Sequence, residues 1–156
     1  MDSNAIELAN RLKKNGIKTR DFFIGLAPGV WDVLVYSDGN EWTVRHIFMH
    51  IVETEQDIPT LVKRIINGHP GVAENFDIDK YNQTQVDKVD SIAVKELIKL
   101  FVVRRAETVS FVEGLSDDDL NLRGRHPFLG ETEIYEMLRL MILHIQLHMR
   151  DIGKVI

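Results

Sequence analysis

The chain of 156 residues contains no cysteine. This excludes disulfide scaffolds, thiolate zinc sites and cysteine nucleophiles, and nothing in the composition requires an oxidising compartment. The sequence also has no run of about 18 apolar residues, which is the length that a membrane-spanning helix needs. Its first residues hold no uninterrupted apolar stretch of the kind found in a secretory signal. We therefore expect a cytoplasmic protein without membrane contact.

The chain also has fewer basic than acidic residues. Lys and Arg number 19 against 24 Asp and Glu, so the formal net charge is −5 at pH 7. Proteins that bind nucleic acids usually carry a basic stripe, because contacts with phosphates supply much of their affinity. The only loose basic cluster here lies within residues 13–20. We therefore predict that the protein has no nucleic-acid partner.

Hydrophobic residues make up 44% of the chain and charged residues 28%, which is typical of a globular protein. The length suits one domain over residues 1–156. Apolar residues recur at helical spacing in residues 4–26, 44–66, 91–113 and from 132 to near the C-terminus. No segment alternates as a strand does. The sequence therefore predicts an all-α four-helix bundle, whose helix order stays open at this point.

Polar segments separate the predicted helices. Residues 68–90 and 121–130 show no apolar periodicity, and we predict that both are loops. Thr43 is the predicted N-cap of the second helix, because its hydroxyl can accept from an unpaired amide of the first turn. Ser116 is the predicted cap of one short helical turn.

Histidine is the unusual resource of this sequence, with six residues in total. His144 and His148 fall in the apolar half of the last predicted helix, one turn apart, where both rings can reach one metal ion. Two core histidines satisfied by neighbours are the alternative, although an apolar bundle interior offers few such partners. In the second helix, His50 lies at the edge of the apolar stripe, whereas His46 points further toward solvent. We therefore predict a metal site of His50, His144 and His148, with His46 at the surface.

A site of three histidines leaves at least one coordination position open, which is typical of catalytic rather than structural metal sites. Ligands of this kind suit zinc, nickel, iron or copper. An open ion can lower the pKa of bound water, or hold a thiolate or a carbonyl oxygen. The sequence therefore indicates metal-dependent chemistry without selecting the ion.

Four charged residues lie near the predicted apolar stripes. Glu55 and Arg105 fall inside them, and because an unpaired buried charge is costly, we predict that the two side chains pair. Glu53 follows His50 by about one turn and could serve bound water as a base, but it points outward. Asp151 lies on the side of the last helix that carries the histidines. It either orients a ligand imidazole or is solvated, and we favour the solvated state.

These features together resemble the DinB-like (DinB/YfiT) superfamily of metal-binding four-helix bundles. The similarity rests on the segment Glu-Trp-Thr-Val-Arg at residues 41–45, His50 and Glu55 after it, the loop Gly-Arg-His-Pro at residues 124–127, and the pair His144 and His148. It covers nearly the whole chain. The resemblance implies that His50, His144 and His148 are the metal ligands, that the helix order is not a simple up-and-down one, and that the protein forms a homodimer.

Superfamily members of known chemistry include thiol-dependent S-transferases and isomerases that use bacillithiol, mycothiol or glutathione. The resemblance therefore implies metal-dependent transfer of a low-molecular-weight thiol to a small electrophile, with zinc, nickel or iron as the metal. It also suggests Tyr81, Asn82 and His126 as substrate contacts. Two alternatives remain: a hydrolase that uses metal-bound water, and a non-catalytic bundle that binds metal.

Overall fold

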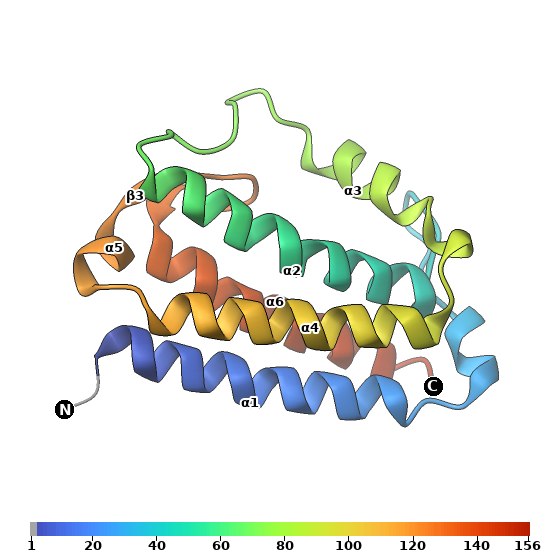
Figure 1. Ribbon diagram of the computed structural model, residues 1–156. Coiled ribbons are helices and arrows are strands. Elements are labelled where there is room, and N and C mark those ends of the chain that lie inside the picture. Colours follow the sequence, from blue (N-terminus) through green and yellow to red (C-terminus); the bar gives the residue numbers. More distant parts are fainter. Residues whose placement is uncertain (1–2) are drawn as a thin grey trace.

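The computed structural model describes residues 3–156 and consists of four long helices with shorter elements between them (Figure 1). The long helices are α1 (Asn4–Ile24), α2 (Val44–Ile66), α4 (Val94–Glu113) and α6 (Ile134–Gly153). Because they pack side by side around a shared core, the predicted all-α four-helix bundle is confirmed. α4 begins three residues and α6 two residues later than the periodicity predicted.

Polar side chains set the beginnings of two helices as predicted. The Thr43 hydroxyl accepts from the backbone N–H of His46, and the backbone N–H of Thr43 donates to His46 Nδ1 at 3.0 Å. This reciprocal capping box satisfies two amides that the helix leaves unpaired. Ser116 and Asp119 form the same motif at the start of α5 (Asp117–Asn121). His46 is thus half-buried and caps α2, where the sequence predicted only a surface residue.

The long helices do not follow one another around the bundle. Both α1 and α2 pack mainly against α4 and α6. Figure 1 shows that α2 and α4 run in the same direction, from right to left, whereas α1 and α6 run the opposite way. Two parallel neighbours cannot be joined by a tight turn, so the chain between α2 and α4 returns along the whole bundle. The helix order therefore includes a crossover, as the resemblance implied.

The crossover is not the plain loop that the sequence predicted for residues 68–90. It contains the helix α3 (Ile78–Val86), which begins where the Asp77 side chain accepts from the N–H of Lys80. A short 3-10 helix follows at Val89–Ser91, where we had expected the next long helix to begin. The sequence missed α3 because only Val86 of this helix is buried, which leaves no apolar stripe to detect.

Two short β-hairpins were also missed. β1 (Leu34–Tyr36) pairs with β2 (Trp42–Thr43), and β3 (Arg123–His126) pairs with β4 (Gly130–Glu133). Both pairs are antiparallel. All four strands are too short to show a recognisable alternation of apolar and polar residues. β3 lies within the predicted loop 121–130, whereas β4 extends beyond it to Glu133, into the segment predicted as the last helix. The second hairpin also binds the crossover, because the N–H of Arg125 donates to the Pro70 carbonyl at 2.8 Å.

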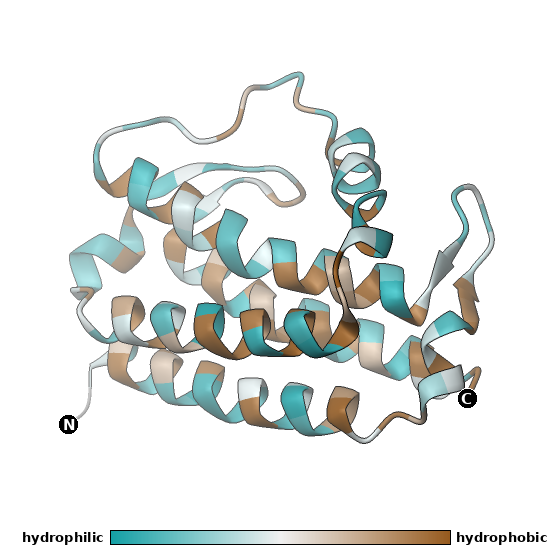
Figure 2. Ribbon diagram, turned by 45° about the vertical axis from the view of Figure 1, so that its right-hand side comes forward, coloured by the Kyte–Doolittle hydropathy of each residue, from teal (hydrophilic) through white to brown (hydrophobic). Residues whose placement is uncertain are grey.

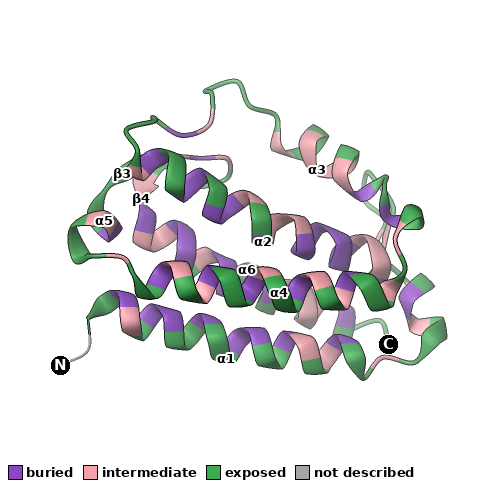
Figure 3. Cartoon of the chain, in the orientation of Figure 1, coloured by how far each residue is buried: buried purple, intermediate pink, exposed green. Residues whose placement is uncertain are grey.

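The core lies along the inner faces of the four long helices, which are apolar and buried (Figures 2 and 3). Aromatic residues fill one end of it. Phe23 of α1 stacks on Phe48 of α2 with ring centroids 4.2 Å apart, and Trp31 and Phe101 complete this group. Within residues 3–156, no helix is both long and apolar enough to cross a membrane.

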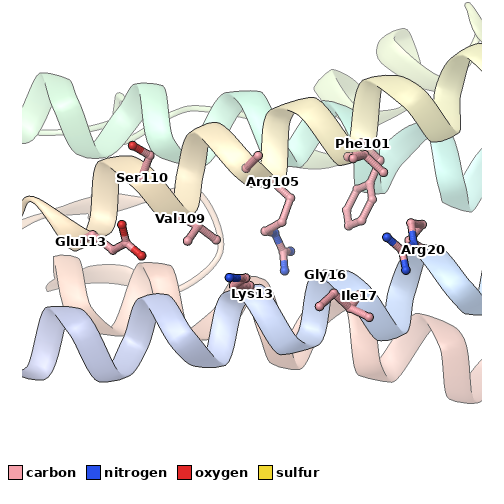
Figure 4. Close-up of a pocket in the computed structure, with 11 residues that line it drawn as sticks. Lys13, Gly16, Ile17, Arg20, Phe101, Arg105, Val109, Ser110 and Glu113 are labelled. Atoms are coloured by element: carbon pink, nitrogen blue, oxygen red, sulfur yellow. The ribbon is translucent and has the colours of Figure 1, made fainter.

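Arg105 crosses the core, and its partner is the predicted Glu55. Figure 4 shows the side chain reaching from α4 toward α1, beside Gly16. A Cβ atom added at Gly16 would lie 2.7 Å from Arg105 Cγ, which is too close for two carbon atoms. Packing thus explains the glycine at position 16, because a larger side chain there would collide with Arg105.

Candidate metal centre

The imidazole rings of His50, His144 and His148 converge between α2 and α6. His144 Nε2 lies 3.0 Å from His50 Nε2 and 2.9 Å from His148 Nε2. One ring nitrogen from each residue lies within 4.8 Å of the other two. His50 is 8% exposed, while His144 and His148 are half-buried. The structure therefore brings together the three residues that the sequence proposed as ligands.

The electrostatics of this cluster suit a cation. Burial lowers the pKa of His144 to about 4 and that of His148 to about 3, and it holds the pKa of His50 well below its usual value. All three rings are therefore neutral at pH 7, and each keeps a lone pair on one nitrogen. Neutral imidazole nitrogens are good ligands for zinc, nickel and iron. The residues present thus fit a transition-metal ion.

A tyrosine stands behind one of the three rings. The hydroxyl of Tyr36, on β1, lies 3.0 Å from His148 Nδ1 and donates to Asp151 Oδ2 at 2.6 Å. Burial raises the pKa of Tyr36 above its usual value, and the hydrogen bond from Tyr36 lowers the pKa of Asp151. Asp151 is therefore not simply solvated, which corrects the state we favoured from the sequence. Tyr36 itself carried no detectable signal, because its strand has only three residues.

Carboxylates take no part in the cluster among the residues that the structure describes. Glu53, the predicted base of a hydrolase, is turned toward α4, where its Oε1 lies 3.7 Å from Arg104 Nη1. This agrees with the helical-wheel argument that Glu53 points away from the histidines.

His50 and His144 form part of the wall of a cavity of about 450 Å³. α2, α3 and α6 contribute most of this wall, together with the tip of the β3–β4 hairpin. Most of the lining is apolar and includes Ile58, Leu61, Ile78, Met137, Met141 and Leu147. A cavity of this kind is typical of sites for small molecules.

Tyr81, Asn82 and His126 all line this cavity, so the structure places the three predicted substrate contacts beside two of the predicted ligands. α3 carries Tyr81 and Asn82 there from a segment that the sequence treated as a loop. The Tyr81 hydroxyl donates to Asp57 Oδ2 at 3.0 Å, and burial is the main cause that raises the pKa of Tyr81 to about 12. That they contact a substrate stays a prediction.

His126 has a defined proton arrangement. Its Nδ1 accepts from the backbone N–H groups of Phe128 and Leu129, both at 3.0 Å, and the residue is only 5% exposed. Burial and the nearby His144 lower its pKa to about 4, so the ring is neutral. A neutral ring that accepts at Nδ1 carries its proton on Nε2. His126 therefore offers one N–H donor beside the cavity, whereas His69 is exposed and accepts from Gly71 outside the cavity.

A second cavity, of about 300 Å³, lies between α1 and α4 (Figure 4). Its lining includes Ile17, Phe101 and Val109, but none of the three clustered histidines. Arg105, which also lines it, is already paired with Glu55.

The sequence pattern of the DinB superfamily matches residues 6–152. The chain belongs to the DinB superfamily. The comparison with curated proteins gives no match.

Solved structures share the fold of this DinB-superfamily chain at low sequence identity. YfiT from Bacillus subtilis, described as a probable metal-dependent hydrolase with an unusual four-helix bundle topology, is 14% identical with a TM-score of 0.79, over 99% of this chain and 88% of that one. The colibactin self-resistance protein ClbS, solved with double-stranded DNA, is 13% identical with a TM-score of 0.72, over 99% and 95%. A mycothiol-dependent maleylpyruvate isomerase is 12% identical with a TM-score of 0.77, over 98% and 64%.

Proposed function

We propose that this protein is a metal-dependent enzyme that transfers a low-molecular-weight thiol to a small, mainly apolar electrophile. The observation that carries the proposal is the shared wall between the histidine cluster and the cavity, since His50 and His144 belong to both. A guest in the cavity would lie next to an ion held by His50, His144 and His148. Its apolar part would pack against the aliphatic residues of α2 and α6.

Zinc, nickel or iron bound by these histidines would favour the thiolate form of a thiol, which is the reactive nucleophile. The protein's own groups would then orient the electrophile. His126 would donate its Nε2–H to an oxygen of the guest, while Tyr81 and Asn82 would contact it from α3. The absence of a carboxylate from the cluster, among residues 3–156, favours a thiol, which needs less help than water to lose its proton near pH 7.

A metal-dependent hydrolase is the second candidate. It is supported by the three neutral histidines, since such ligands can hold an ion that lowers the pKa of bound water toward about 7. The shared fold with YfiT agrees with this candidate. A non-catalytic bundle that only binds metal is the third, and turnover distinguishes it from both enzymes.

The experiment combines metal analysis with product detection. Protein purified without an affinity tag is analysed for bound metals, and the loaded protein is then incubated with glutathione, bacillithiol or mycothiol and 1-chloro-2,4-dinitrobenzene. The thiol displaces chloride from this substrate slowly without protein, so conjugate that forms above this rate with wild-type protein but not with His144→Ala supports the transferase. Hydrolysis of simple esters without conjugate would favour the hydrolase, and bound metal without any turnover would favour the binder.

The proposed partners follow the same reasoning. We infer a homodimer from the superfamily resemblance, which sedimentation velocity tests directly. We also infer that nucleic acid is not a partner, because the net charge of −5 opposes contact with phosphates. Fluorescence anisotropy with labelled double-stranded DNA at low salt would show a rise on titration if this inference were wrong.

A further inference from the structure

We propose that Tyr36 is a positioning residue of the metal centre, which fixes the proton of His148 on Nδ1 and so keeps Nε2 free to bind the ion. The proposal rests on the metal site put forward above. It adds a residue from outside the four-helix bundle, on β1, whose hydroxyl touches both His148 and Asp151.

The hydrogens available on Tyr36, Asp151 and His148 determine where the imidazole proton lies. A tyrosine hydroxyl has one hydrogen to donate, whereas an ionised carboxylate can only accept. Asp151 is ionised at pH 7, because an ordinary aspartate has a pKa of about 3.9, and it receives the Tyr36 hydrogen over 2.6 Å. The Tyr36 oxygen is then an acceptor toward His148 Nδ1 at 3.0 Å. Nδ1 must therefore carry the imidazole proton, and the lone pair of the neutral ring lies on Nε2.

The consequence reaches the other two ligands. His148 Nε2 lies 2.9 Å from His144 Nε2, which in turn lies 3.0 Å from His50 Nε2. With its proton held on the far side of the ring, His148 presents a lone pair to the place where the ion would bind. A carboxylate that sets the orientation and proton of a ligand histidine is a common arrangement in metal sites. Here a tyrosine stands between the two groups.

The same hairpin supports a second ligand. The ring of Trp42, on β2, lies 5.3 Å from the ring of His50, and its Nε1–H donates to Gln83 Oε1 of α3. β1 and β2 are paired through Leu34 and Thr43, so Tyr36 and Trp42 are held in a fixed relation. The β1–β2 hairpin is thus attached to His148 on one strand and packs against His50 on the other.

The test is the affinity for Zn²⁺, measured by competition with a chromophoric chelator. Tyr36→Phe removes the hydroxyl and keeps the ring, and we expect the dissociation constant to rise about 10-fold to 100-fold. Tyr81→Phe is the matched control, because it removes another tyrosine–carboxylate hydrogen bond, to Asp57, without touching a clustered histidine. Its dissociation constant should stay within about twofold of that of the wild type.

Two further measurements distinguish a loss of folding from a loss of the positioning role of Tyr36. Thermal unfolding of the metal-free variants shows whether Tyr36→Phe is folded, and the absorption bands of bound Co²⁺ report the ligand geometry. We expect altered bands for Tyr36→Phe and unchanged bands for Tyr81→Phe. Should Tyr36→Phe fail to fold, Asp151→Ala serves in its place, because it frees the Tyr36 hydrogen to compete for Nδ1, and it should weaken Zn²⁺ binding about 10-fold.

The outcomes separate the two levels of the proposal. If wild-type protein binds no Zn²⁺, the metal site itself is wrong. If the wild type binds Zn²⁺ and a folded Tyr36→Phe or Asp151→Ala binds it equally well with the same Co²⁺ bands, the metal site stands and the role of Tyr36 is overturned.

Discussion

Arg105 of α4 and Glu55 of α2 form a two-point ion pair inside the bundle. Arg105 Nε donates to one carboxylate oxygen at 2.8 Å and Nη2 to the other at 2.5 Å. The remaining nitrogen, Nη1, donates to the Leu12 carbonyl and to the Asn15 side chain, at 2.8 and 2.9 Å. Arg105 is 4% exposed and Glu55 is 2% exposed. The pair thus connects three helices and leaves no buried side-chain polar atom unsatisfied within the described chain.

Breaking this pair should be costly. We expect Glu55→Ala to lower the free energy of unfolding by about 3–5 kcal/mol, because it leaves the guanidinium buried without its counter-charge. Urea denaturation followed by circular dichroism measures the loss. Glu136→Ala is the control, since its pair with Arg139 is exposed and is worth at most about 1 kcal/mol. A loss for Glu55→Ala no larger than that of the control would show that the pair does not stabilise the fold.

For Gly16→Ala, packing and helix propensity predict opposite changes in stability. Alanine favours a helix over glycine by about 1 kcal/mol. Gly16→Ala should nevertheless destabilise the protein, because its Cβ would press against the Arg105 side chain at 2.7 Å. Gly153→Ala is the matched control, since its Cβ would meet nothing within 4 Å, and it should be neutral or stabilising. Thermal unfolding midpoints compare the two variants, and a stabilised Gly16→Ala would contradict the packing argument.

The four histidines of α2 and α6 should differ in their effect on metal content. We expect His144→Ala, His148→Ala and His50→Ala each to lose the bound metal, whereas His46→Ala keeps it. Because His46 belongs to the capping box of α2, His46→Ala should instead lose about 1 kcal/mol of stability. Elemental analysis and urea denaturation give the two readouts. Metal lost from His46→Ala but kept in His50→Ala would reverse our choice of ligand on α2.

Acid should destabilise the metal-free protein. The pKa of His126 in the folded state is about 4, below the usual histidine value of about 6.5 that applies in the unfolded chain. Between these values the unfolded chain binds a proton that the folded chain does not, so the free energy of unfolding falls as the pH drops. The slope is at most about 1.4 kcal/mol per pH unit for each such ring.

Urea denaturation of chelator-treated protein between pH 7 and pH 4.5 measures this slope. His126→Gln removes one titrating ring. The free energy of unfolding of this variant should therefore fall less steeply with pH than that of the wild type, by up to about 1.4 kcal/mol per pH unit. An equal slope would mean that His126 is already protonated, or exposed, in the folded state.

The sequence predicted those parts of the molecule that repeat along a helix. His144 and His148 share one face by spacing alone, and Glu55 and Arg105 stood out because they interrupt apolar stripes. Tyr36 could not be found in this way, since a three-residue strand has no period and its partners lie 112 and 115 residues away. The proton arrangement of His126 depends on a tight turn after β3, whose backbone N–H groups no periodic pattern could position.

His46 shows why one helical position was misjudged. The helical wheel describes which way a side chain leaves the helix, and it correctly set His46 apart from His50. A residue in the first turn can nevertheless fold back onto its own N-terminus, as His46 does onto Thr43. Capping boxes commonly have Glu or Gln at the third helical position, so the histidine there did not indicate a capping box.

The parallel arrangement of α2 and α4 has a consequence for which part of the cavity wall can change in sequence. Because the chain must travel back along the bundle, it places α3 at the wall of the cavity, where Tyr81 and Asn82 are among the lining residues. Val86 is the one buried residue of that helix. The residues that α3 contributes to the cavity wall can therefore change at little cost to folding, while the histidines on α2 and α6 stay in place.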